Sequence, residues 1–313
     1  MTHSRGLILL VVTNIIWGTT YVVAKVALET VPPALLAALR FTLATSLLWG
    51  ILLWQARSRR HEPAPFVAVR GADRWRLLGL GLSGVGLGYL LAYWGVSLTT
   101  ATDAALMIIG EVIFTTVLAA LIAGEQVGRW RGLGITLGVV GVLVLVLGSA
   151  VEGGGGSQGM WRAVGNLLVL SGIFFEALYT VLGAGLARRI PPLTMIAYAY
   201  AGSMLVWLPI ILGHLFTGQL PAFNPAAGLS VLYLAIFPSV VCVITWFTVI
   251  RTTGASLGAL SLFVQPVVGA VLGTWLLGDP ITVSLVAGAV LIFVALYLTT
   301  LPAPRPQSVS LEV

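Results

Sequence analysis

The sequence predicts an all-α integral membrane protein, on the evidence of its composition, the length of its apolar runs and its charge pattern. Hydrophobic residues make up 58% of the 313 residues and only 8% are charged, with a mean hydropathy of +1.04. A soluble domain carries about a quarter charged residues. The apolar runs are continuous and about twenty residues long, enough to cross a hydrocarbon core of about 30 Å as a helix. Barrel strands are shorter, about ten residues, and alternate in polarity, so we predict a helical bundle.

Ten apolar runs have the length expected of transmembrane helices. They cover residues 6–28, 34–54, 76–97, 103–123, 131–149, 163–186, 193–213, 227–249, 255–277 and 281–301. If the N-terminus is cytoplasmic, 13 of the 16 Lys and Arg residues fall in cytoplasmic segments. Cationic loops stay on the cytoplasmic side of a membrane. We therefore expect both termini in the cytoplasm.

The same charge pattern bounds the partners and cofactors. The net charge of +6 gathers in loops, so we expect a lipid bilayer as the surrounding partner and no nucleic acid. The single cysteine, Cys242, permits no disulfide within the chain and no cysteine-rich metal site. The histidines His3, His61 and His214 have no metal-ligand spacing. We expect no cofactor and no metal.

One apolar stretch, Ala104 to Glu125, has an echo 154 positions later at Gly258 to Asp279. Within the pair, Glu111 corresponds to Gln265 and Glu125 to Asp279. Two copies of one helix, each with a polar residue at the same depth, predict a duplicated membrane protein with a site between its halves.

The duplication extends over the whole chain. The sequence from Gly6 aligns with that from Gly165 at an offset of 159. Five spans per copy is an odd number, so the two copies must have opposite orientations in the membrane. We predict repeats at 1–150 and 161–302, a Gly-rich flexible linker at 151–160 and a disordered tail at 303–313. Inverted repeats of this kind are typical of secondary transporters, which bind substrate near the bilayer midplane between the repeats.

Several of these motifs resemble a known family. IIWGTTYVVAK begins at Ile15, PPALLAALRF at Pro32, and ALYTV at Ala177, and the fourth span ends in LIAGE. The pattern is similar to that of EamA-type transporters of the drug/metabolite transporter superfamily, and in layout to bacterial aromatic amino acid exporters. The resemblance implies export of small metabolites, commonly amino acids, across a bacterial inner membrane. The chain departs from it where Val112 corresponds to Pro266.

Glu111 is the first candidate for the transport site. Ionisable residues inside a membrane are costly, about 2.5–3.5 kcal/mol on insertion scales, and mark substrate or ion pathways. Met107 and Thr115 lie on the same helical face at i−4 and i+4. We expect all three, with Gln265, to line a central cavity. The alternative is a protonated glutamate that only joins neighbouring helices.

Glu176, in the sixth span, is the second candidate. It lies near Tyr179 on its helix and corresponds to the stripe Asn14, Trp17 and Tyr21 on the first span. Burial disfavours a charged carboxylate, which makes Glu111 and Glu176 candidates to bind a proton or a substrate ammonium. Aromatic rings hold apolar side chains or cations. The alternative is that the rings fill space.

Other residues receive simpler interpretations. Arg40 and Lys25 are interpreted as side chains that snorkel to the outer surface, Arg40 alternatively as a partner of Glu29 or Asp103. Asp103 is interpreted as a residue that caps its helix or complements its dipole. Gly84 and Gly88 belong to a Gly-rich third span that is predicted to move as a gate with the fourth.

The predicted function is non-ATP-driven export by alternating access, because no ATP-binding motif is present. Proton coupling, a facilitative mechanism, and a monomer or a homodimer all stay open. A drug or other metabolite exporter is the alternative within transport. An intramembrane enzyme is disfavoured, since no nucleophile–base pair is visible. A channel is disfavoured because nothing resembles a selectivity filter.

Overall fold

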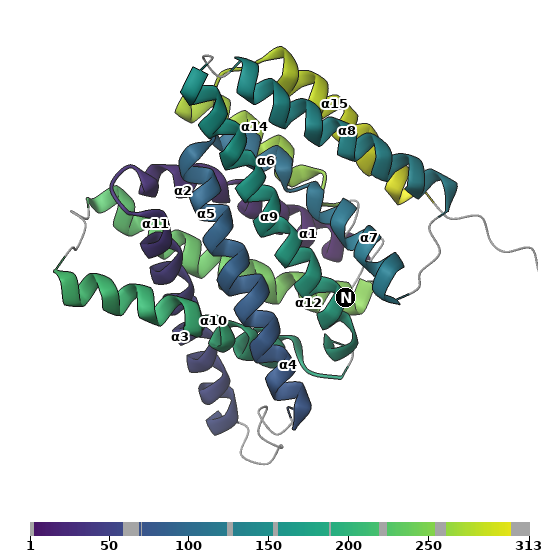
Figure 1. Cartoon of the computed structure of the whole chain (residues 1–313). Helices are drawn as coiled ribbons and strands as arrows, with labels where there is room; N and C mark the ends of the chain where they lie inside the picture. The colour runs from purple at the N-terminus through teal and green to yellow at the C-terminus, as the bar shows by residue number, and fades with distance from the viewer. Residues whose placement is uncertain are drawn as a thin grey trace, which may run out of the picture.

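The computed structural model describes residues 3–58, 69, 71–123, 128–152, 156–187, 189–218, 224–253 and 261–301. In these ranges all regular structure is helical (Figure 1). Eight spans are long and apolar enough to cross a membrane, and two shorter apolar helices lie in the predicted ninth and tenth runs. The expected all-α membrane fold is therefore confirmed.

The described residues of the first half form nine elements. They are α1 (His3–Gly18), α2 (Thr20–Leu28), α3 (Pro33–Ser58), α4 (Ala72–Leu80), the π-helix η2 (Gly81–Gly88), α5 (Tyr89–Leu98), α6 (Ala101–Met107), α7 (Gly110–Ala123) and α8 (Arg129–Glu152). The second half forms α9 (Gly156–Ala187), α10 (Pro192–Thr217), α11 (Pro225–Ile236), the π-helix η3 (Phe237–Cys242), α12 (Val243–Thr253), α14 (Val264–Leu277) and α15 (Val283–Thr300).

The helix ends follow from local sequence. Pro33, Pro192 and Pro225 each open a helix, where the missing N–H costs nothing. The Asn224 side chain caps α11 by accepting from the Ala227 N–H at 2.7 Å. Helices α8 and α9 extend into the segment predicted as a linker, leaving only 153–155 outside the described residues. The predicted tail, 303–313, lies outside them entirely.

Two helix irregularities occur at matching places in the two halves. A turn at residues 108–109 separates α6 from α7, and a turn at 262–263 precedes α14, at the same offset of 154. The third span contains η2 and the eighth contains η3. A glycine-rich sequence permits the first π-helix, and Pro238, which lacks an N–H, lies in the second. All four irregular segments border the cavity described below.

Helices α8 and α15 pack side by side along one edge of the bundle (Figure 1). Glycines permit this close approach. A Cβ on Gly148 would lie 2.0 Å from the Ser284 Cβ, and one on Gly141 would lie 2.8 Å from Ile292 Cγ1. Packing of small residues replaces the hydrophobic effect as a driving force for helix association inside a bilayer.

A buried polar network joins four elements near one end of the bundle. Arg162 donates to both Asp103 oxygens, from Nε at 2.8 Å and from Nη2 at 2.9 Å. Asn166 also donates to Asp103. Lys25 donates from Nζ to the Val96 carbonyl at 2.8 Å. The network connects α2, α5, α6 and α9.

This network corrects two interpretations. Thr100, not Asp103, caps α6. Asp103 does lie in the first turn of α6, as its dipole alternative expected, and its carboxylate also pairs with Arg162. Lys25 does not snorkel to the surface, because its ammonium caps the exposed carbonyls at the end of α5. In both cases a buried charge finds partners on other helices, which sequence spacing does not show.

The outward faces of the bundle are apolar. Phe216 is 87% exposed, Val283 80% and Trp275 77%. A soluble protein seldom exposes so many large apolar side chains together, so these faces fit a lipid environment.

Candidate functional site

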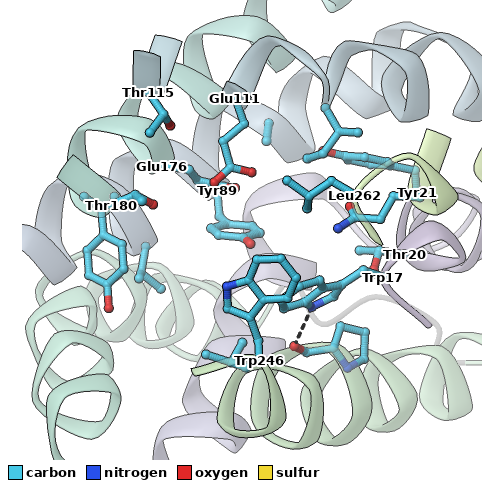
Figure 2. Close-up of a pocket in the computed structure, with 18 of the residues that line it drawn as sticks. Trp17, Thr20, Tyr21, Tyr89, Glu111, Thr115, Glu176, Thr180, Trp246 and Leu262 are labelled. Carbon is cyan, nitrogen blue, oxygen red and sulfur yellow. Dashed lines mark hydrogen bonds between the residues drawn. The ribbon is translucent and has the colours of Figure 1, made fainter. Parts of the chain in front are cut away.

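A central cavity of about 380 Å³ lies between the two halves of the chain (Figure 2). Its volume is within the usual range of small-molecule sites. Elements α1, α2, α3, η2, α5 and α7 line it from the first half, and α9, α10, η3, α12 and α14 from the second. Helices α8 and α15 contribute no lining residue.

Two carboxylates face the cavity from different halves. Glu111 lies one residue after the start of α7, and Glu176 lies in the middle of α9. Figure 2 shows both side chains above the ring of Tyr89. Both carboxylates therefore lie in one enclosed space. Two like charges in one cavity are relieved by a shared proton or by a cation between them.

Arg40, on α3, also lines the cavity, and it does not snorkel as the sequence suggested. It is 2% exposed and donates from Nε to the Ser239 hydroxyl at 2.8 Å and from Nη1 to the Tyr93 hydroxyl at 2.6 Å. Its guanidinium carbon lies 4.9 Å from the ring centroid of Phe41 and 5.2 Å from that of Tyr89. Glu29 and Asp103, the two expected partners, are not bound to it in the described structure.

An aromatic wall closes another side of the cavity. The Trp17 and Trp246 ring centroids are 5.3 Å apart, and Phe247 lies beside Trp246 in the lining. Trp17 Nε1 donates to the Pro238 carbonyl at 3.0 Å, which fixes its ring against η3 (Figure 2). The wall therefore presents large apolar surfaces, and the indole N–H of Trp17 is already bonded.

Most of the predicted site residues line the cavity. These are Trp17, Tyr21, Glu111, Thr115, Glu176, Tyr179 and Gln265, together with the predicted gate residue Gly84. Three do not line it: Asn14, Met107 and Gly88.

Asn14 lies behind Gln265 and holds it. It is fully buried, donates to the Leu10 carbonyl at 2.7 Å and to the Ser261 hydroxyl at 2.8 Å, and accepts from Gln265 Nε2 at 2.7 Å. Its amide therefore joins α1 to the start of the ninth span and orients the Gln265 side chain.

Met107 and Gly88 have packing positions. Met107 is fully buried in the apolar cluster with Leu106, Ile109 and Leu170, because the turn at 108–109 rotates α6 relative to α7. A straight helix would place Met107 on the face of Glu111. A Cβ on Gly88 would lie 3.1 Å from the Gly172 carbonyl and from Phe175 Cβ, so this glycine lets η2 approach α9.

Sequence reasoning missed several lining residues, chiefly Tyr89, Tyr93, Tyr200 and Trp246. Tyr89 and Tyr93 are spaced i, i+4 on one helix and Arg40 lies in a neighbouring span. An arginine inside an apolar span, together with aromatic residues at i and i+4 on a neighbouring span, could have indicated these lining residues.

The sequence model of the EamA-like transporter family matches residues 4–147 and 163–301. The chain belongs to the EamA-like transporter family. The matched ranges cover both halves of the cavity and omit the join between α8 and α9.

Relatives of this EamA-like protein extend over almost its full length. It is 27% identical to an "Uncharacterized transporter" of Archaeoglobus fulgidus over 95% of this chain and 98% of the relative. It is 29% identical to the "Uncharacterized inner membrane transporter YedA" of Escherichia coli K12, over 91% and 87%. It is also 29% identical to a "Probable amino-acid metabolite efflux pump" of Salmonella typhimurium, over 95% of both chains.

A solved crystal structure shares the fold, with a TM-score of 0.62 at 21% identity over 95% of this chain and 96% of that chain. Family membership and these relatives make the EamA-like protein a multi-pass membrane transporter and not an intramembrane enzyme. Among the described residues, no group of His, Cys, Asp or Glu has the geometry of a metal site.

Proposed function

We propose that this EamA-like protein is a secondary exporter of small metabolites, most specifically of amino acids, aromatic ones included. The observation that carries the proposal is the cavity itself, in which two carboxylates, one arginine and an aromatic wall surround about 380 Å³. These groups match the ammonium, carboxylate and ring of an aromatic amino acid. The relative named as an amino-acid metabolite efflux pump supports this substrate class.

Alternating access between two inverted five-helix repeats is the mechanism that we propose. The matching turns at 108–109 and 262–263, and the matching π-helices, support the repeat. Discontinuous helices beside a midplane cavity are typical of such transporters. The proposed orientation has both termini in the cytoplasm. The proposed location is a bacterial inner membrane, and the relative YedA is named an inner membrane transporter.

We propose proton coupling through Glu111 and Glu176. Both line the cavity without an ion-pair partner in the described part of the chain, so each is free to exchange a proton for a substrate group. A transporter without an ATP-binding motif must use a gradient. A pair of carboxylates can couple transport to a proton gradient, because each can bind and release a proton.

Export of cationic drugs is the second candidate. The carboxylates and the tryptophans would suit an organic cation, but Arg40 in the same cavity opposes a second positive charge. The amino-acid proposal uses all three charged groups and is therefore preferred.

Uptake by proteoliposomes tests the proposal. Purified protein is reconstituted, and uptake of radiolabelled amino acids and of an organic cation is measured with and without a pH gradient. Empty liposomes and the Glu176→Gln protein serve as controls. We expect saturable uptake of aromatic amino acids, accelerated by the gradient. Uptake of the cation alone would replace amino acids with drugs as the substrate, and uptake of neither would contradict the proposal.

A further inference from the structure

Among the described residues, Arg40 is the only cationic side chain that lines the cavity. Its guanidinium carries a permanent positive charge in the middle of a membrane bundle. In the described structure no carboxylate forms an ion pair with it, although Glu111 and Glu176 line the same cavity. A buried charge without a counter-ion is costly and is retained where it binds something.

The hydrogen bonds of Arg40 leave part of its guanidinium available. Of its five N–H groups, Nε–H is bonded to Ser239 and one Nη1–H to Tyr93. Nη2 has no acceptor among the residues described. The bound side of the fork fixes the guanidinium plane, and the remaining donors suit a carboxylate, which a guanidinium binds through two parallel hydrogen bonds.

Tyr89 places this cation close to the anionic groups without joining them. Its ring centroid lies 5.2 Å from the Arg40 guanidinium carbon, and Figure 2 shows Glu111 and Glu176 above the same ring. The two charges are thus separated by one aromatic side chain. A zwitterionic headgroup carries both of the complementary charges on one carbon, so it can face the cation and the carboxylates of this cavity at once.

We propose that Arg40 binds the substrate carboxylate while Glu176, with Glu111, binds the substrate ammonium, so that the cavity selects zwitterionic α-amino acids over amines and over acids. This assignment rests on the proposed transport of amino acids. The side chain of the substrate then lies toward Trp17 and Trp246, on the aromatic wall.

The two halves of the chain supply these charges unequally. At the offset of 159, Arg40 corresponds to Ala199 and Glu176 to Trp17. At the offset of 154, Glu111 corresponds to Gln265. The charged groups therefore do not repeat, and a zwitterion has one favoured orientation in an otherwise pseudo-symmetric cavity.

The test compares ligands that keep or lose the carboxylate. Phenylalanine, its methyl ester, phenethylamine and phenylpropionate compete against labelled phenylalanine in proteoliposomes that contain wild-type, Arg40→Gln or Arg40→Lys protein. Arg57→Gln, which changes an exposed arginine outside the cavity, is the matched control. Thermal unfolding in detergent identifies any variant that fails to fold. Tryptophan fluorescence reports ligand binding without transport.

We expect wild-type protein to prefer phenylalanine over its ester by about 10- to 100-fold, the value of a charge-assisted hydrogen-bonded pair. In Arg40→Gln the preference should collapse to near unity, because only the carboxylate-bearing ligand weakens. Arg40→Lys should restore part of the preference for phenylalanine, since lysine keeps the positive charge but lacks the two parallel donors of a guanidinium. Arg57→Gln should match wild type.

A uniform loss for phenylalanine and its ester in folded Arg40→Gln protein would overturn the proposal, because a purely structural arginine does not discriminate between them. If Arg40→Gln does not fold, the ligand preference of Arg40→Lys decides in the same way. If wild type takes up no amino acid, the proposed function fails. Fluorescence then separates the two. Phenylalanine binding to wild type that Arg40→Gln weakens would uphold the carboxylate site, whereas no phenylalanine binding, or binding that Arg40→Gln leaves unchanged, would overturn it.

Discussion

At the scale of single residues, the ion pair between Asp103 and Arg162 shows that buried charges in this bundle are paired with each other. Both residues are almost completely buried, and Thr99, Asn166 and Ser149 extend the network. Removing one partner of such a pair leaves an uncompensated charge, at a cost of about 3–5 kcal/mol. By contrast Asp73 pairs with Arg76 and Arg189, whose side chains are more than 60% exposed.

We therefore predict that Asp103→Asn lowers the unfolding temperature in detergent strongly, whereas Asp73→Asn changes it little. The exposed pairs at Asp73 contribute only about 0–1 kcal/mol. Thermal unfolding followed by size-exclusion chromatography measures both. Equal effects of the two substitutions would contradict a structural role for the Asp103 network.

The cavity carboxylates carry the second residue-scale prediction. Glu111→Gln and Glu176→Gln should each flatten the dependence of transport on pH, because an amide cannot exchange a proton. Glu29→Gln, at an exposed helix end, is the control and should keep the wild-type profile. Initial rates between about pH 5 and 8 provide the measurement. A wild-type profile in both cavity variants would exclude proton coupling through these residues.

At the scale of elements, the close approach of η2 to α9 depends on residues without a side chain. A Cβ on Gly84 would lie 2.6 Å from Tyr179 Cβ, whereas one on Gly79, in α4, meets nothing within 4 Å. The glycines that the sequence analysis interpreted as part of a gate thus also let η2 and α9 pack closely, which is a usual role of small residues in membrane helices.

We predict that Gly84→Ala reduces both thermal stability and transport, because the added methyl group forces Tyr179 or its helix to move. Gly79→Ala should be neutral or stabilising by up to about 1 kcal/mol, since alanine favours a helix. The comparison uses unfolding temperature and initial uptake rate. If Gly84→Ala keeps full stability and loses only transport, the glycine acts in a moving gate. If it keeps both, η2 has more freedom than its packing implies.

At the scale of the whole molecule, the proposed inverted repeat fixes which ends of the helices face each side of the membrane. Cys242 is the single cysteine and is buried, so a Cys242→Ala background lacks reactive thiols. Gln158 and Ser58 are exposed at opposite predicted surfaces.

In that background we predict that Gln158→Cys reacts with a membrane-impermeant maleimide in intact cells. Ser58→Cys should react only after the membrane is opened. The positive-inside distribution of arginine is the physical reason. Gel-shift labelling measures both sites, with Cys242→Ala alone as the blank. The reverse labelling pattern would show the opposite orientation in the membrane. Labelling of both sites in intact cells would contradict the proposed topology.

The class of the protein follows from the sequence alone, because hydropathy and the length of apolar runs are local properties. The sequence also identified four residues that line the cavity, Glu111, Glu176, Trp17 and Gln265. A polar residue inside a twenty-residue apolar run is costly unless it faces a cavity or a polar partner. The internal offset of 154 pairs Glu111 with Gln265, and both line the cavity.

The roles of the other charged residues depend on the folded structure. Arg40, Lys25 and Asp103 found partners 53 to 199 positions away in sequence, or backbone carbonyls at the end of a neighbouring helix. The turn at 108–109 removed Met107 from the cavity, although an uninterrupted helix would have kept it there. Burial of a charge is affordable only when other helices complete its hydrogen bonds, and which helices do so depends on packing across the whole bundle.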